Sequence, residues 1–150
     1  LTEQRLMMVV PKHFTDQRFG IHADEVRLQY DQGADISAFQ QFPFVLIKRG
    51  NRTRNIVDQY FSRYYFKPQL ILETENTVTT LAMAQAGVGI TICPELFLRA
   101  IPNASADSAG VDLFPLTDPS TFSKLVAGYR RDRYLSHFGE RFIDMVHNAI

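Results

Sequence analysis

Residues 73–95, "ETENTVTTLAMAQAGVGITICPE", place a strand end, a polar turn, a helix, two glycines and a short apolar strand in succession. Asn76 or Thr77 can cap the helix, because a short side-chain oxygen accepts a hydrogen bond from a free N–H of the first turn. Gly87 suits the left-handed position that ends such a helix. Strand–helix–strand units are parallel and right-handed in nearly all proteins, so we predict an α/β fold. The predicted apolar stripe of this helix consists of Val78, Leu81, Ala82 and Ala86.

Apolar runs of strand length recur along the chain. Residues 6–10, "LMMVV", end at Pro11 and predict a strand that is buried on both faces of a parallel sheet. Polar and apolar residues alternate at 26–30, which predicts a half-exposed strand. Further strands are predicted at 42–47, 70–72, 89–93, 111–116 and 124–130.

Helical spacing of apolar residues predicts helices at 53–65 and from about residue 135 onward, and a short helix is predicted at 36–41. Because the aromatic residues of the first helix follow this spacing, we interpret them as core residues and not as a surface for stacking bases. The two predicted stripes consist of Ile56, Val57, Tyr60, Phe61 and Tyr64, and of Leu135, Phe138, Phe142, Val146 and Ile150.

The charge balance excludes whole classes of partner. Among 150 residues, 16 basic residues face 16 acidic ones and give a net charge of zero, so no overall field attracts nucleic acid or anionic lipid. The longest apolar runs are far shorter than the roughly 18 residues of a membrane helix. The single cysteine, Cys93, excludes an internal disulfide and fits a reducing cytoplasm. We interpret it as an inert core thiol.

Nothing in the sequence assembles an enzyme or a metal site. The four histidines, His13, His22, His137 and His147, have no metal-binding spacing. A G-x-S-x-G nucleophile motif is absent from the sequence as well. We therefore expect a protein that is not an enzyme and that needs no cofactor.

Three segments resemble, in order and spacing, the C-terminal effector-binding half of the bacterial LysR-type transcriptional regulators, and together they cover most of the chain. They are "PFVLIKRGNRTRNIVDQYF", "PQLILETENTVTTLAMAQAGVGITICPE" and "LVAGYRRDRYLSHFGERFIDMV". The "YRRDR" turn opens the last helix; it is either a solvated loop or a feature that orients the helix or meets a partner subunit.

The resemblance implies an α/β fold like that of type 2 periplasmic binding proteins, with two lobes, mainly parallel sheets and hinge strands between the lobes. It assigns residues 1–10 to the first lobe with a hinge strand, residues 11–112 to the second lobe, and residues 113–150 to the return into the first lobe. The family's helix-turn-helix domain, linker helix and opening first-lobe elements have no counterpart in this sequence, so the first lobe is incomplete.

The resemblance also implies a function. A small anionic metabolite would bind between the lobes and modulate DNA binding by a helix-turn-helix domain that this chain does not contain. The regulator would be a cytoplasmic homodimer or homotetramer without contact to a membrane. The alternative is a free-standing periplasmic-type solute-binding module that uses the same cleft.

Two polar corners are the candidate effector site. Ligands bind outside the carboxyl ends of parallel strands, where loops lead into helix N-termini with free N–H groups. The alternative is that the Asn and Thr residues are only helix caps. Likewise, Arg49, Arg52 and Arg54 either neutralise an anion or form a solvated face. The candidate residues are Gly50, Asn51 and Thr53 in one corner, and Glu75, Asn76 and Thr77 in the other.

Overall fold

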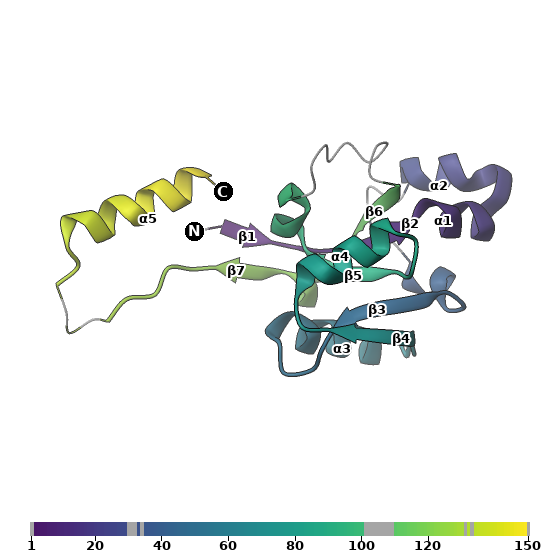
Figure 1. The fold of residues 1–150 in the computed structure, drawn as a ribbon, viewed down its shortest axis with the longest axis horizontal. Helices are drawn as coiled ribbons and strands as arrows, with labels where there is room; N and C mark the ends of the chain where they lie inside the picture. Colours follow the sequence, from purple (N-terminus) through teal and green to yellow (C-terminus); the bar gives the residue numbers. More distant parts are fainter. Residues whose placement is uncertain are drawn as a thin grey trace.

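The structure is a computed structural model that describes residues 2–29, 33, 35–100, 110–130, 132 and 134–149. A body of strands and helices lies at the right and centre of Figure 1, and a narrow two-stranded ribbon leaves it toward the left and leads to the C-terminal helix. Among the described residues, no helix is long and apolar enough to cross a membrane.

Strand β2 (Leu6–Pro11) lies at the centre of the body and all of its residues are buried. It pairs antiparallel with β5 (Thr91–Pro94) on one side and with β6 (Val111–Pro115) on the other. The prediction of a parallel strand at 6–10 is therefore wrong. A continuous apolar run indicates burial on both faces, but it carries no information about the direction of the neighbouring strands.

The remaining strands of the body, β3 (Pro43–Ile47), β4 (Gln69–Thr74), β5 and β6, share one direction. Strand β3 pairs in parallel with β4, and Phe44 forms a parallel bridge with Ile90 next to β5. Since β5 and β6 are both antiparallel to β2, strands β3, β4, β5 and β6 all run in the same direction. The prediction of parallel strands joined by a helix is confirmed for β4 and β5, which lie on either side of β3.

Residues 12–29 form two helices joined by a helical turn, and a strand was predicted over the last part of this stretch, at 26–30. Helix α1 (Lys12–Phe19) leads through the turn η1 (Gly20–His22) into α2 (Ala23–Gln29). The strand predicted at 26–30 is therefore wrong as far as Gln29, and Tyr30 lies outside the described residues. A pattern of five alternating residues is too short to separate a strand from a helical turn.

Three helical segments were predicted where the structure has them. The short 3-10 helix η3 (Ile36–Phe39) precedes β3, α3 (Arg52–Arg63) follows it, and α4 (Thr77–Gln85) follows β4. Gly87 has the predicted left-handed backbone, with φ of 78°. The predicted stripe of α4 is wrong except for Leu81, because the helix is uncharged and its small residues give no clear polar face. The residues that α4 buries are Thr77, Thr80, Leu81 and Ala84.

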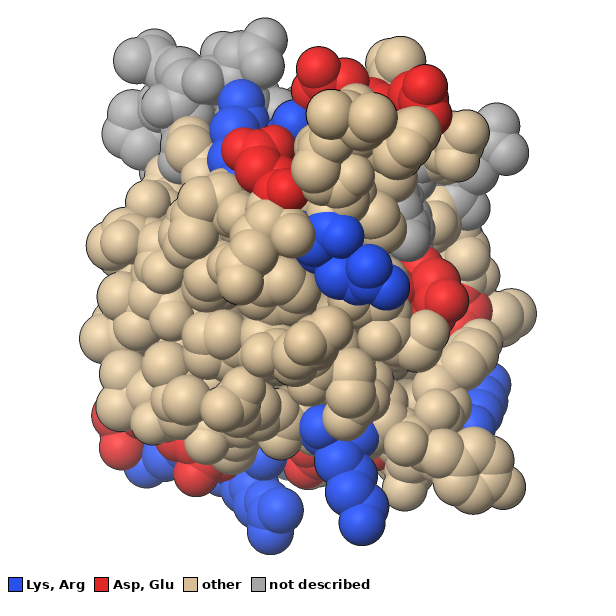
Figure 2. Space-filling model, turned by 90° about the vertical axis from the view of Figure 1, so that its right-hand side faces the viewer, with Lys and Arg blue, Asp and Glu red and all other residues tan. Residues whose placement is uncertain are grey.

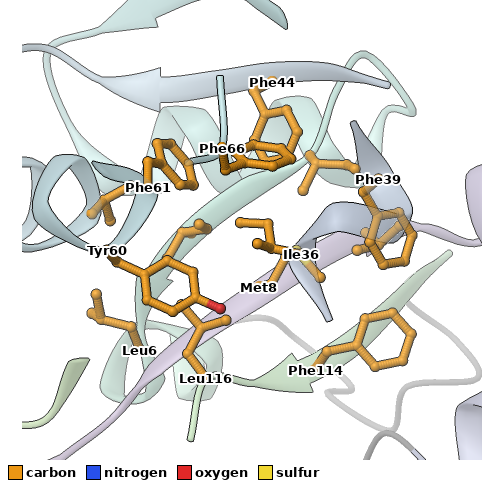
Figure 3. Close-up of a cluster of buried hydrophobic side chains, with 14 of the residues drawn as sticks. Leu6, Met8, Ile36, Phe39, Phe44, Tyr60, Phe61, Phe66, Phe114 and Leu116 are labelled. Carbon is orange, nitrogen blue, oxygen red and sulfur yellow. The ribbon is translucent and has the colours of Figure 1, made fainter. Parts of the chain in front are cut away.

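Aromatic and aliphatic side chains from distant parts of the sequence form the larger of two hydrophobic clusters (Figure 3). Phe44 stands edge-on to Phe61 and Phe66, with ring centroids 5.9 and 5.5 Å away. The α3 stripe was predicted correctly except for Tyr64, which is 52% exposed. Residues labelled in Figure 3 are Leu6, Met8, Ile36, Phe39, Phe44, Tyr60, Phe61, Phe66, Phe114 and Leu116.

The ribbon consists of β1 (Thr2–Gln4) and β7 (Ser123–Leu125), which pair antiparallel. Residues 126–130 are not in a strand, so the strand predicted at 124–130 ends early. Helix α5 (His137–Ala149) has no buried residue, and its Phe138 and Phe142 are 83% and 62% exposed. The remaining elements are the 3-10 helices η4 (Glu95–Ala100) and η5 (Pro119–Thr121).

A charge cluster fastens α2 to the sheet. Arg27 Nε lies 2.9 and 3.0 Å from the two carboxylate oxygens of Asp112, which is only 6% exposed. The other guanidinium nitrogens donate to Asp16 at 2.7 Å and to Asp24 at 2.8 Å. The Asp112 hydrogen bond is the main cause that raises the pKa of Arg27.

Replacing Arg27 by methionine should lower the free energy of unfolding by about 3 kcal/mol, because it leaves the buried Asp112 carboxylate without a partner. Urea denaturation measures the change. Arg130→Met is the matched control, since Arg130 pairs with Asp132 on the surface, where an ion pair contributes little to stability. Equal effects of the two variants would contradict a structural role for the cluster.

Candidate functional site

The two polar corners lie side by side at the carboxyl ends of β3 and β4. Ile47 and Thr74 are register partners in the last step of the parallel pair, and Lys48 N donates to Thr74 O at 2.9 Å. Both strand ends lie at the left of the body in Figure 1, on the side from which the ribbon leaves. The adjacency of the predicted corners therefore follows from one pair of neighbouring parallel strands.

The first corner turns the chain from β3 into α3. Gly50 has φ of 93°, a left-handed backbone that favours glycine, and open space lies around its Cα. Asn51 caps α3, because its Oδ1 accepts a hydrogen bond from Thr53 N at 2.8 Å. Gly50 and Asn51 are exposed and Thr53 is half-buried, so the three predicted residues share one corner, and Asn51 serves there as a helix cap.

The second corner turns the chain from β4 into α4. Asn76 is the cap, and its Oδ1 accepts hydrogen bonds from Thr79 N and Thr79 Oγ1, both at 2.9 Å. Thr77 is only 8% exposed and belongs to the buried face of α4. Of the predicted residues in this corner, Glu75 and Asn76 face solvent. An asparagine whose oxygen caps a helix still carries two N–H donors.

Lys48 is a member of this site that the sequence analysis missed. Its Nζ lies 2.6 Å from a carboxylate oxygen of Glu75, and this ion pair joins the two corners. Both side chains are more than half exposed, so the pair contributes little to stability and its partners can exchange. The signal that could have identified Lys48 is its position directly after β3, opposite the end of a parallel β4.

The three arginines of the first corner divide into two kinds. Arg49 and Arg52 are exposed, as a solvated face requires. Arg54 is 3% exposed and donates to Ile47 O, Asp58 and Glu73, so it is neither of the alternatives that were considered. Burial opposes the charge of Arg54, but these carboxylates outweigh it and raise the pKa of Arg54. It fixes α3 to the ends of β3 and β4.

Cys93 and the four histidines lie where the sequence indicated. Cys93 is fully buried in β5, and burial raises the pKa of its thiol to about 12, so it is not a reactive thiolate. The four histidines are exposed. Within the described part of the chain, no group of histidine, cysteine and carboxylate residues could hold a metal ion.

The fold and the corner together define a class: an α/β domain of the kind that binds small ligands at the ends of its strands. A family model described as LysR substrate binding domain matches residues 1–150. The chain therefore belongs to the LysR substrate-binding domain family, which confirms the resemblance.

Two curated relatives are transcriptional regulators. The chain is 25% identical over 145 residues to the uncharacterised HTH-type transcriptional regulator YwbI of Bacillus subtilis, covering 96% of the chain and 42% of YwbI. It is 33% identical over 54 residues to the transcriptional activator protein LysR of Escherichia coli, covering 36% of the chain and 17% of that protein. The chain thus spans less than half the length of these relatives.

Solved structures show the same fold. HinK, a LysR family transcriptional regulator from Pseudomonas aeruginosa, matches over 98% of this chain and 46% of the HinK chain, with a TM-score of 0.69 and 15% identity. The effector-binding domain of QuiR in complex with shikimate matches 99% of the chain and 62% of its own, with a TM-score of 0.62 and 17% identity. The CcmR regulatory domain of Synechocystis PCC6803 in complex with 2-PG matches over 98% of this chain and 63% of the CcmR chain, with a TM-score of 0.62 and 18% identity. These likenesses confirm the predicted periplasmic-binding-protein-like α/β fold.

Two substitutions at Asn76 distinguish the contribution of its capping oxygen from that of its amide nitrogen. Asn76→Ala should lower the free energy of unfolding by about 1 kcal/mol, because the first turn of α4 loses its cap. Asn76→Asp should leave it unchanged or raise it slightly, since a carboxylate caps as well and favours a helix N-terminus. Urea denaturation of the two variants checks this. If both variants lose the same stability, the Asn76 oxygen is not the cap.

Proposed function

We propose that this chain is the effector-binding part of a bacterial LysR-type regulator, which senses a small anionic metabolite and thereby modulates DNA binding by a helix-turn-helix domain outside this sequence. One observation carries the proposal: the N-termini of α3 and α4 lie side by side at the carboxyl ends of neighbouring parallel strands. Each terminus offers backbone N–H groups and the positive end of a helix dipole.

The charges around the corner favour an anion. Lys48, Arg49 and Arg52 are exposed there; of the two exposed carboxylates at the end of β4, Glu73 pairs with the buried Arg54 and Glu75 pairs with Lys48. An incoming carboxylate or phosphate can replace Glu75 as the partner of Lys48 without leaving a buried charge unpaired. Gly50, Asn51, Thr53 and Asn76 would then supply backbone and side-chain donors, and Thr77, whose side chain is buried, would supply its backbone N–H. QuiR and CcmR, which share the fold, are described with shikimate and 2-PG.

In this proposal residues 11–112, which make up most of the body, correspond to the second lobe, and the ribbon with α5 corresponds to parts of the first. The apolar residues Phe138, Phe142 and Met145 on α5 are all more than 60% exposed. A helix with such a bare apolar stripe needs a surface to cover it, and the remaining elements of a first lobe would supply that surface. The effector would then bind between the corner and that lobe.

Modulation of DNA binding requires only that the effector prefers one arrangement of the lobes. Direct binding of DNA by these residues is not part of the proposal. The described residues on the face in Figure 2 show basic and acidic side chains interspersed, without a continuous basic surface. The family consists of regulators, which supports a cytoplasmic regulator over a free-standing solute-binding module and over an enzyme.

Strand β4 and helix α4 are the proposed contact for a homodimer or homotetramer. Leu70, Ile71 and Leu72 are 37%, 50% and 39% exposed on β4, and Val78 is 59% exposed on α4. In the described sheet β4 pairs with β3 alone, so its other edge remains a template for a further strand or helix. Exposed apolar residues beside an open edge are typical of a contact between subunits.

The anion site is tested in the complete regulator with Asn76→Asp, which keeps the cap but replaces two N–H donors by a negative charge. Calorimetric titration with a panel of small carboxylates and phosphates, including shikimate and 2-phosphoglycolate, identifies an anion that binds the wild type. Its Kd should rise about tenfold or more in the variant, because a hydrogen bond to a charged group is lost.

Gln59→Glu is the matched control, since it adds one negative charge on the exposed side of α3 and should leave the Kd unchanged. Glu75→Gln should lower the Kd, because it frees Lys48. Unchanged affinity in both Asn76→Asp and Glu75→Gln would remove the corner as the effector site.

The subunit contact is tested with Ile71→Lys, which places a charge in the proposed apolar interface. Light scattering after size-exclusion chromatography should show the complete regulator shifting toward a smaller assembly. Leu28→Lys, on α2, is the control, because Leu28 is 79% exposed outside the proposed contact. An unchanged mass for Ile71→Lys would rule out β4 as the contact.

A further inference from the structure

Helix α3 connects the candidate effector corner with the point where the chain leaves the body. Its first residue follows the cap Asn51, and its last residue is Arg63. At 1.5 Å per residue, the helix spans about 18 Å. After Tyr64, the left-handed Tyr65, with φ of 52°, turns the chain so that Phe66 N donates to Phe61 O at 2.8 Å and Phe66 enters the core. The far end of α3 is therefore firmly held.

The C-terminal end of α3 contacts Asp118, which lies in the turn that joins β6 to β7. Arg63 Nη1 lies 2.9 and 3.2 Å from the two carboxylate oxygens of Asp118, and Tyr64 Oη donates to one of them at 2.9 Å. Ser120 donates to the same carboxylate from its N at 2.8 Å and from its Oγ at 2.5 Å. We define Arg63, Tyr64 and Asp118 as the clamp.

Asp118 is suited to a fixed attachment. Its side chain is 6% exposed, and the hydrogen bonds from Ser120 are the main cause that lowers its pKa to about 2, so the carboxylate stays charged. The turn itself is stiff, because Thr121 Oγ1 donates to Leu116 O at 3.0 Å and to Asp118 O at 2.6 Å. The end of α3 is therefore attached through Asp118 to the turn that leads into β7.

The other crossing strand has a weaker side-chain attachment. Arg5, between β1 and β2, lies 3.2 Å from Glu95, and the two side chains are 42% and 48% exposed. An ion pair so open to solvent contributes little. Main-chain hydrogen bonds hold both crossing strands, from Glu95 N to Arg5 O at 3.1 Å and from Leu116 N to Leu6 O at 2.9 Å. The two strands differ in their side-chain attachments, and the one with a buried carboxylate, Asp118, ends at α3.

We propose that the clamp sets the angle between the body and the ribbon, and that α3 transmits a shift at the effector corner through Asp118 to β7. Asp118, Arg63 and Tyr64 are positioning residues in this scheme and do not touch the effector. The transmission step rests on the proposed function, whereas the setting of the angle does not. Core contacts of Val57, Tyr60 and Phe61 keep α3 a single rigid element.

The test measures the distance between spin labels on Gln17→Cys in α1 and Lys124→Cys in β7 of the complete regulator, with cysteines outside these 150 residues replaced. Both sites are exposed, while Cys93 is buried and does not react. Without ligand, the double variant Arg63→Gln with Tyr64→Phe should at least double the width of the distance distribution. Arg5→Gln should leave the width unchanged.

An unchanged width in a double variant that melts at the wild-type temperature would overturn the clamp. If the double variant does not fold, the single variant Tyr64→Phe is measured instead, and the width of its distance distribution is compared with that of the wild type in the same way.

Transmission is tested with an anion from the panel that binds the wild type. In the double variant Arg63→Gln with Tyr64→Phe, the Kd of this anion should stay the same, while the ligand-induced change in the distance between the spin labels falls to half or less. A change in distance equal to that of the wild type would overturn transmission. If no anion binds the wild type, the proposed function fails, and the width measured without ligand still decides the clamp.

Discussion

Strand β2 runs against the other four strands of the body, and this orientation governs how the chain is laid out. All of its residues are buried, and both of its edges are paired. Because β2 enters from the ribbon and β6 runs back toward it, the entry and exit of the body lie next to each other. The ribbon of β1 and β7 follows from that geometry, and everything between residues 12 and 110 is inserted between two neighbouring crossing strands.

The same geometry places the candidate site. Strands β3 and β4 run in the direction of β6, so their carboxyl ends reach the side from which the ribbon leaves (Figure 1). The helix caps needed at those ends are Asn51 and Asn76. Their oxygens stabilise the helices while their amide nitrogens stay exposed to solvent, so one side chain can serve both fold and ligand. For these residues the two interpretations of the sequence are compatible.

Features set by neighbours in sequence could be predicted. The cap at Asn76, the left-handed Gly87 and the core stripe of α3 depend on residues within one or two helical turns. Features set by partners far along the chain could not. The direction of β2, the burial of Arg54 against Glu73, the pair of Lys48 with Glu75, and the attachment of Asp118 to Arg63 all require knowing which strand lies beside which. The helix at 23–29 was missed for another reason, because five alternating residues fit two periodicities.

Residues 126–130 connect the ribbon to α5 as an extended and exposed segment, with Val126 and Tyr129 70% and 65% exposed. Proteases cleave backbone that is accessible and free of regular hydrogen bonds. When α5 is covered by a neighbouring surface, this segment is anchored at both ends; when it is not, the segment is an open target. Docking of α5 on a neighbouring surface would therefore also restrict the access of a protease to residues 126–130.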